Sequence, residues 1–563
     1  MHMPSSKVMP PRSGFGDADG YAQGWSRTIV SHRIAVWLSV LFCAGLLAVP
    51  LTDALMGSWR EPALKAKDGL ARIFGCFTKG DFGWSTIVAA NNEALSAIQG
   101  FETSLEDSSA LAGAVRPSAL DRLLRVGGAG SEEAYIGRDG WLFYRPDVDA
   151  LVMQTNMNMN NAAAAGIADF AAELAEQNVR LVVVPVPGKG SIYPEKLAAD
   201  GNEFAAPPVS PVLSALEKNV ESAWRAKNIA GPALAPVVIN ATDLLWRRKV
   251  ETGKDQFLKT DSHWAPDAMQ TVAQFVAQSL DPTEPSSANG IRNVRSQDVT
   301  GVGDTASMLK LPESSPLLAP QTVTVDRVES EKGDSWNPDR SSDVLVLGDS
   351  FTNIYSSESL GWGGSAGFAE QLSRFLGFNV DKLSRNDAGA KSAREMLASE
   401  AVRNPGWLEG KKVVIWVLAA REFMRGDWER VNLDSGKPAA AFGDFFVVAP
   451  GSPLEVEARI VSHGPVPVAG ESPYADYLTA VHLTDLRDAA TGKAIPGDVL
   501  AYVFTMRDHR VVPAPDLVEG ERARLRLSNY AEKAGQLDSL NRGEIDDVEV
   551  MMRKPNFAEW TTP

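Results

Sequence analysis

Short continuous runs of apolar residues, rich in valine, recur through the middle of the chain between amphipathic stretches. Three runs have the length and β-branched composition typical of buried parallel strands, at residues 179–186, 343–347 and 412–418. The pattern also predicts a strand at 379–383 and helices at residues 160–177, 211–226, 266–280 and 369–376. This alternation predicts an α/β domain at 130–440, with a mostly parallel sheet and helices on both faces.

Two further stretches of this region have their own signatures. The Asp-Gly pair at 139–140 is flanked by apolar and aromatic residues, which predicts a β-hairpin at 136–143. Residues 284–340 are rich in serine, proline and asparagine. We expect them to form loops that cover a functional site.

The pattern changes after residue 440, where short runs are separated by turns rich in proline and glycine. Six runs are predicted as strands, at residues 445–448, 454–461, 478–483, 499–506, 522–527 and 548–551. They predict a small all-β domain at 441–563, built like a sandwich. Tyr474 and Tyr477 precede one strand in a loop, so they are candidates to pack on sugar rings and make this a carbohydrate-binding domain. Tyr502 and Phe504 share one face of a strand and are expected in the core instead.

An uncharged apolar run at residues 34–51 stands near the N-terminus. A helix of this length spans about 27 Å, close to the roughly 30 Å hydrocarbon core of a bilayer. Basic residues before the run favour a cytoplasmic side. The sequence therefore predicts a cytoplasmic tail at 1–33, a single transmembrane anchor at 34–52 and a helical stalk at 53–129, with everything beyond the anchor outside. A cleaved signal peptide and a buried helix are the alternatives.

Composition narrows the class of protein further. The formal net charge of −16 opposes binding to nucleic acid. There are only two cysteines, and one of them, Cys43, lies in the apolar run, so an intrachain disulfide is not expected. Cysteines and histidines do not cluster at zinc-binding spacing. We predict neither a metal site nor a cofactor.

The candidate chemistry centres on Ser350. The predicted strand at 343–347 leads into Gly348-Asp349-Ser350, so the serine stands at the carboxyl end of a parallel strand, where ligands bind in such sheets. A serine nucleophile needs an adjacent base. His263 is the only histidine between the apolar run and residue 460, and Asp261 precedes it by two residues and can orient its imidazole. The alternative is that Ser350 and Asp261 only cap helices.

These motifs carry a family resemblance over residues 130–440. A Gly-Asp-Ser sequence after a strand, with Asp and His close together elsewhere, resembles the SGNH (GDSL-type) hydrolases, whose sheet is flavodoxin-like. The motif Thr-Asp-Ser-His-Trp at 260–264 precedes Gly-Asp-Ser here, which reverses the usual order. That order, with Gly-Arg-Asp-Gly-Trp-Leu-Phe at 137–143 and a strand ending in Val-Pro-Gly-Lys, resembles the alginate O-acetyltransferase (AlgX/AlgJ-like) family.

The resemblance implies roles for particular residues. Ser350 would be the nucleophile, His263 the general base and then acid, and Asp261 its orienting partner. Gly389 suits the glycine of the family's oxyanion hole, whereas Arg421 occupies roughly the place of its asparagine, which leaves that donor open; an ion-pair role for Arg421 is the alternative. Substrate-contact candidates at the end of the first strand are Lys189 and Tyr193.

The same resemblance implies the activity and its setting. Members acetylate exopolysaccharides outside the cytoplasmic membrane, so this chain is expected to be an O-acetyltransferase of the inner membrane, with its catalytic domain in the periplasm. A polysaccharide would be the acceptor, and a membrane-bound O-acyltransferase would supply the acetyl group. The alternatives are a carbohydrate esterase of the same fold and a non-catalytic glycan-binding subunit of a secretion complex.

Overall fold

The structure is a computed structural model that describes residues 52–78, isolated positions between 90 and 122, and most of residues 130–561. The gaps are at residues 54, 58, 132, 154–158, 198–209, 230–233, 281–292, 313, 331, 434–444, 468–473, 509, 513–516 and 546. The chain forms two compact units, Met1–Leu120 and Asp121–Pro563.

The first unit contains helix α3 (Arg60–Thr78), which falls within the predicted stalk. The predicted anchor lies outside the described residues, apart from its last position. Within the part of the chain that the structure describes, no helix has both the length and the apolar composition needed to cross a membrane.

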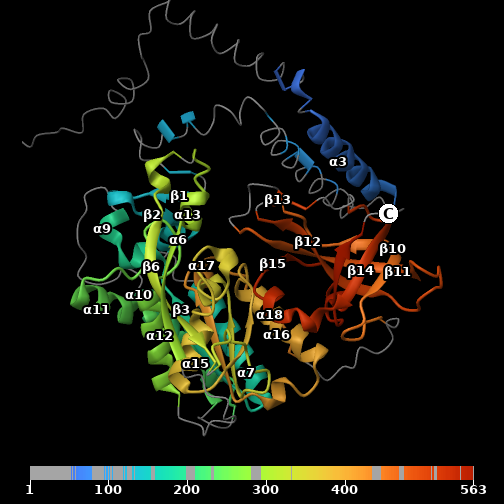
Figure 1. Ribbon diagram of the computed structural model, residues 1–563. Helices are drawn as coiled ribbons and strands as arrows, with labels where there is room; N and C mark the ends of the chain where they lie inside the picture. The colour runs from blue at the N-terminus through green and yellow to red at the C-terminus, as the bar shows by residue number, and fades with distance from the viewer. Residues whose placement is uncertain are drawn as a thin grey trace, which may run out of the picture. The chain divides into compact units, whose positions relative to one another are not determined.

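A five-stranded parallel sheet forms the centre of the second unit (Figure 1). Its strands run in the order β4-β3-β9-β7-β8 and have these bounds: β4 (Val237–Val238), β3 (Arg180–Val186), β9 (Val413–Ala419), β7 (Val344–Gly348) and β8 (Asp381–Ser384). All four pairings are parallel. The three apolar runs are therefore confirmed as its central strands, β3, β7 and β9.

Helices cover both faces of this sheet, as predicted. One face packs on α7 (Met159–Glu176), α10 (Ser210–Ala226) and α16 (Ala390–Arg403). The other face packs on α11 (Ala241–Thr252), α12 (Pro266–Ser279) and α15 (Phe368–Leu376). Successive residues of a strand point to opposite faces, so Leu181 and Val182 enter different cores. Burial on both faces explains why these strands read as continuous apolar runs.

The stretch at 284–340 departs from the prediction of loops. It contains a two-stranded antiparallel ribbon, β5 (Asn293–Gly301) with β6 (Gln321–Glu329). Polar pairs such as Ser296 with Asp326 and Thr300 with Thr322 link its strands across an exposed face. Because most of β5 is exposed, it lacks the apolar alternation by which strands are recognised in a sequence.

The hairpin predicted at 136–143 is confirmed. Strand β1 (Ala134–Ile136) pairs antiparallel with β2 (Leu142–Tyr144). Asp139 and Gly140 both adopt positive φ angles, 55° and 79°, in the connecting turn. An Asp-Gly pair accepts this backbone conformation at low cost, which is why the sequence signal was reliable.

The C-terminal region is built as a closed ring of strands, so the predicted sandwich is wrong. The ring runs β10-β11-β12-β16-β14 and back to β10. Its strands are β10 (Leu454–His463), β11 (Tyr477–Asp488), β12 (Val499–Arg507), β14 (Arg522–Asn529) and β16 (Asn556–Trp560). Register shifts between β10 and β11 mark bulges, which raise the local twist and so help a sheet to close.

Two of the six strands predicted after residue 440 do not form. Residues 445–448 contribute only an isolated bridge, from Phe445 to Asp498, and Val548–Met551 is a short helix, α19. The closing strand β16 was not predicted at all. It pairs parallel with β12 and antiparallel with β14, so its place in the ring depends on long-range pairing.

A buried ion pair links a residue just before the start of β9 to the start of the edge strand β8, and it gives a test of the fold. Lys411 Nζ lies 2.8 Å from Asp381 Oδ2, and both side chains are almost inaccessible to solvent. Replacing Lys411 with Met should lower the free energy of unfolding by about 3–5 kcal/mol, because the buried Asp381 would lose its nearer cation and keep only Arg340, at 3.5 Å. Lys254→Met, which removes an exposed pair with Asp267, should cost less than about 1 kcal/mol. Urea titration measures both, and equal losses would contradict the assignment.

Candidate functional site

Ser350 follows strand β7 directly and opens the short helix α14 (Ser350–Asn353). The preceding residue, Asp349, caps this turn: its carboxylate accepts hydrogen bonds from the N–H groups of Phe351 (2.9 Å) and Ala419 (3.3 Å). A Cβ at Gly348 would lie 1.9 Å from the Thr352 hydroxyl, so any larger side chain here would clash with the helix that Ser350 opens. The turn fixes Ser350 at the carboxyl end of a central strand.

The structure brings His263 and Asp261 to this serine. His263 Nε2 lies 2.8 Å from Ser350 Oγ, and its Nδ1 lies 2.6 Å from Asp261 Oδ1. All three side chains are buried. A carboxylate beside Nδ1 favours the tautomer with its proton there, which leaves Nε2 free to accept the proton of Ser350.

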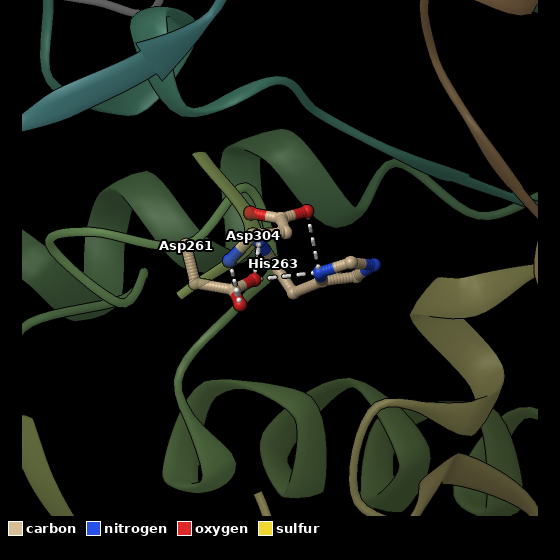
Figure 2. Close-up of side chains that lie close together, drawn as sticks. All are labelled: Asp261, His263 and Asp304. Carbon is tan, nitrogen blue, oxygen red and sulfur yellow. Dashed lines mark hydrogen bonds and ion pairs between the residues drawn. The ribbon is translucent and has the colours of Figure 1, made fainter. Parts of the chain in front are cut away.

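A second carboxylate stands beside the imidazole. Figure 2 shows Asp304 next to the Asp261–His263 pair, with its Oδ2 3.6 Å from His263 Nδ1. Asp304 accepts hydrogen bonds from the N–H (2.6 Å) and hydroxyl (2.5 Å) of Ser262, and its own N–H donates to Asp261 Oδ2 at 3.0 Å. Asp304 was not singled out from the sequence, because it lies between β5 and β6 in the stretch that was expected to form loops.

The three residues could in principle hold a metal ion, since their ligand atoms lie within 4.8 Å of one another. Their hydrogen bonds, however, are those that orient an imidazole. Asp261 Oδ2 also accepts from the indole of Trp362 at 2.9 Å. A Cβ at Gly303 would lie 2.3 Å from the carbonyl oxygen of Thr260, so the Asp304 segment packs directly on the histidine loop.

The charges around the site shift the pKa of each titratable group. Burial lowers the pKa of His263, but the charge and hydrogen bond of Asp261, together with the charges of Asp304 and Asp349, leave it above its ordinary value. Burial raises the pKa of Asp261, yet His263 outweighs this effect and holds it well below the usual range. Burial and the charge of Asp261 raise the pKa of Asp304. Burial raises the pKa of Asp349 to about 6. These charges therefore stabilise the imidazolium that forms when His263 accepts the Ser350 proton, and Asp261 stays ionised.

Ser350 opens into a cavity of about 490 Å³. The residues that line it are Glu133, Tyr144, Pro146, Ser262, Asp304, Met308, Asp349, Ser350, Phe351, Asn386, Asp387, Ala388, Gly389, Arg421, Glu422 and Tyr474. Among the described residues of this lining, Arg421 is the one cation. Its guanidinium pairs with Asp147 at 3.0 Å, which agrees with the ion-pair alternative considered for it.

Gly389 also lies in this lining, at the start of α16. A Cβ there would lie 2.9 Å from a carboxylate oxygen of Glu422, which accepts the N–H of Ala390. Asn386, which sequence reasoning did not single out, is closer to Ser350: its backbone oxygen accepts the Ser350 N–H at 3.2 Å. Its side-chain oxygen accepts from Asn353 at 3.0 Å, which fixes the orientation of its amide. Asn386 thus joins Gly389 as a possible donor to an oxyanion.

Lys189 and Tyr193 do not reach the cavity, so their assignment as substrate contacts is corrected. The Lys189 ammonium is buried and donates to the carbonyl oxygens of Leu142 (2.6 Å) and Lys259 (3.0 Å). The Tyr193 hydroxyl accepts the N–H of Gln256 at 2.6 Å. Both residues therefore support the histidine loop from behind.

The hairpin motif has the same supporting role. The N–H of Leu142 donates to the carbonyl oxygen of Lys259 at 2.9 Å, so β2 is bonded to the segment that leads into Asp261. On the other side of that segment, the indole of Trp264 donates to the Phe351 carbonyl oxygen at 3.1 Å. The hairpin motif at 137–143 and Trp264 of the motif at 260–264 therefore have a structural role: both hold the loop that carries His263.

Comparison with known proteins gives a family for this arrangement. The family model described as "SGNH hydrolase-like domain, acetyltransferase AlgX" matches residues 134–420, just over half of the chain. A protein of Pseudomonas fluorescens named "Probable alginate O-acetylase AlgJ" is 28% identical over 225 residues, which cover 38% of this chain and 52% of the relative. Its namesake in Azotobacter vinelandii is 30% identical over 170 residues, covering 29% and 37%. The chain thus spans about half the length, or less, of these curated relatives.

Among solved structures, that of Pseudomonas aeruginosa AlgX aligns with 70% of this chain and 91% of its own length, at 15% identity and a TM-score of 0.38. The family match covers both segments that carry the candidate site, from the β1–β2 hairpin through the histidine loop to the end of β9. On this match, the chain belongs to the AlgX family of SGNH hydrolase-like acetyltransferase domains.

Proposed function

We propose that the chain is an O-acetyltransferase that acetylates a polysaccharide through an acetyl-Ser350 intermediate. The observation that carries the proposal is the buried sequence of contacts from Asp261 through His263 to Ser350, which opens into a cavity. A serine with a hydrogen-bonded imidazole and an orienting carboxylate is the arrangement that activates a hydroxyl for attack on a carbonyl.

In the first step, Ser350 Oγ attacks the acetyl carbonyl carbon while its proton passes to His263 Nε2. The tetrahedral intermediate collapses, the bond to the donor breaks, and His263 returns the proton to the leaving group. In the second step, a sugar hydroxyl gives its proton to His263 and attacks the acetyl-serine. The acetyl group leaves with the sugar oxygen, and Ser350 regains its proton. Asp261 stabilises the imidazolium in both steps.

The acceptor is proposed to be an exopolysaccharide, because the relatives are named as alginate O-acetylases. The cavity lining bears on how such a polymer would bind. It contains five carboxylates and a single guanidinium, which is paired. Negative charge beside Ser350 repels a uronate carboxylate. A polyuronate would therefore present only its hydroxyl to the cavity and keep its carboxylates towards solvent.

The setting is also part of the proposal. If residues 34–52 anchor the chain in the inner membrane, the site lies in the periplasm, where cytoplasmic acetyl-coenzyme A cannot reach it directly. A membrane-bound O-acyltransferase that passes acetyl groups across the membrane would then be the donor. The C-terminal strand ring would contribute polymer binding.

Replacing Ser350 with Ala tests the proposal. With p-nitrophenyl acetate as donor and alginate oligosaccharides as acceptors, we expect this variant to lose acetyl transfer by about 10⁴-fold or more, because alanine removes the nucleophile and little volume. Mass spectrometry of the oligosaccharides measures the product. The control is Ser357→Ala, a nearby serine outside the cavity lining, which should retain full transfer. Free acetate as the only product of the wild type would indicate an esterase, and activity in Ser350→Ala would exclude the mechanism.

The pH dependence of kcat/KM tests His263. The base must be neutral to act, and its pKa is raised, so activity should fall with decreasing pH around a midpoint above 6.5. Asp304→Asn removes a nearby negative charge and should move this midpoint to lower pH. Asp298→Asn, on the exposed ribbon, should leave it in place. A midpoint that is the same in all three proteins would contradict the role of Asp304, and a profile flat from pH 5 to 8 would contradict His263 as the base.

A further inference from the structure

One side chain of the catalytic cavity comes from the C-terminal region. Tyr474 lies three residues before strand β11, and among the described lining residues it is the only one that follows Glu422 in the chain. Its side chain lines the cavity together with Ser350, and its hydroxyl lies within reach of the Ser350 hydroxyl. A residue far beyond the α/β region therefore lies beside the proposed nucleophile.

The direction of a hydrogen bond between these two hydroxyls follows from the count of protons. Ser350 has a single hydroxyl proton, and His263 Nε2 lies 2.8 Å away to accept it. The phenol must then be the donor to Ser350 Oγ. Burial raises the pKa of Tyr474 well above its ordinary value, so the phenol keeps its proton at neutral pH.

A donor at this position would add to the side-chain amide of Asn386, which also lines the cavity. The Ser350 N–H is already directed at the Asn386 carbonyl oxygen, and the Glu422 carboxylate lies beside Gly389, where negative charge opposes an oxyanion. In an ester, the carbonyl oxygen and the bridging oxygen are attached to the same carbon. A donor that reaches Ser350 Oγ in the free enzyme can therefore reach the carbonyl oxygen by a small rotation once Ser350 is acylated.

We propose that Tyr474 is a catalytic hydrogen-bond donor, which shifts from Ser350 Oγ to the acetyl carbonyl oxygen as the oxyanion develops, so that the C-terminal region completes the active site. This inference rests on the proposed acetyl-Ser350 intermediate. The phenol proton is not transferred; it stabilises the charge that the attack places on the carbonyl oxygen.

The attachment of the C-terminal region supports this position. Strand β15 (Asn541–Gly543) pairs with the beginning of β11, and Glu544 directly after it binds Arg385 at 2.9 Å. Arg385 precedes Asn386 and also holds Asp387, at 2.8 Å. The same end of the strand ring therefore supplies Tyr474 and anchors the loop that lines the cavity beside Ser350.

The test compares Tyr474→Phe with Tyr477→Phe in the full-length chain. Both variants remove one phenol oxygen, and Tyr477 lies outside the cavity lining. The rate of the pre-steady-state burst with p-nitrophenyl acetate measures acylation of Ser350 without any sugar acceptor. We expect Tyr474→Phe to slow the burst by about 10²-fold and Tyr477→Phe to leave it unchanged. The Tm of each variant, matched to the wild type, shows that the fold is retained.

The outcomes separate this inference from the proposed function. A burst in Tyr474→Phe as fast as in the wild type, or faster, overturns the role of Tyr474, while loss of the burst in Ser350→Ala keeps the acetyl-serine. A wild-type burst without acetylation of oligosaccharides would remove the proposed acceptor and leave the comparison of the two tyrosines valid. A burst that survives in Ser350→Ala would overturn both.

Discussion

The contact between His263 Nε2 and Ser350 Oγ joins two segments that lie 87 residues apart in the chain, and the surrounding structure serves to hold it. Each partner is fixed by its own segment. Ser350 is held by the tight turn after β7, and His263 by a loop bonded to β2, to Lys189 and to Phe351. A hydrogen bond of 2.8 Å tolerates little displacement, so these supports are part of the site.

The loop that carries His263 lies inside the protein, which explains why several charged side chains around it have little contact with water. Asp261 and Lys189 are buried and Asp304 is partly buried, which is unfavourable for charged groups unless they are paired or hydrogen-bonded. Here each has partners: Asp261 has His263 and Trp362, Asp304 has Ser262, and Lys189 has two carbonyl oxygens. The charges of Asp261 and Asp304 raise the pKa of His263, so these carboxylates set the basicity of the imidazole as well as its orientation.

The central sheet and the grouping of Asp261, His263 and Ser350 could be predicted from the sequence for physical reasons. Strands buried on both faces must be apolar throughout, so β3, β7 and β9 stand out. A serine needs a base, and His263 was the only histidine in the α/β region. Local signals of this kind do not depend on how distant segments pair. The roles of these residues in catalysis remain proposals that the experiments above address.

Other features depend on contacts that no local pattern encodes. The ribbon β5–β6 is held by polar cross-strand pairs and an exposed surface, and β16 is placed by pairing with two distant strands. Asp304 lies between β5 and β6, and Asn386 follows β8. Their places in the site therefore depend on how these strands pack. Lys189 has a motif-like position, but burial directs its ammonium to backbone oxygens. Tyr474 was marked as a loop aromatic for sugar binding, whereas its contact with Ser350 required the fold of both regions.

The most direct test of the account is to follow one acetyl group through the protein. Full-length enzyme would be acetylated with an isotopically labelled ester, freed of excess donor, and then mixed with oligosaccharide, while peptide mass spectrometry monitors Ser350 and the sugar together. The account predicts that the label sits on Ser350 and leaves it at the rate at which it appears on a sugar hydroxyl. Label on the sugar without prior acetylation of Ser350, or loss of the Ser350 label only to water, would contradict it.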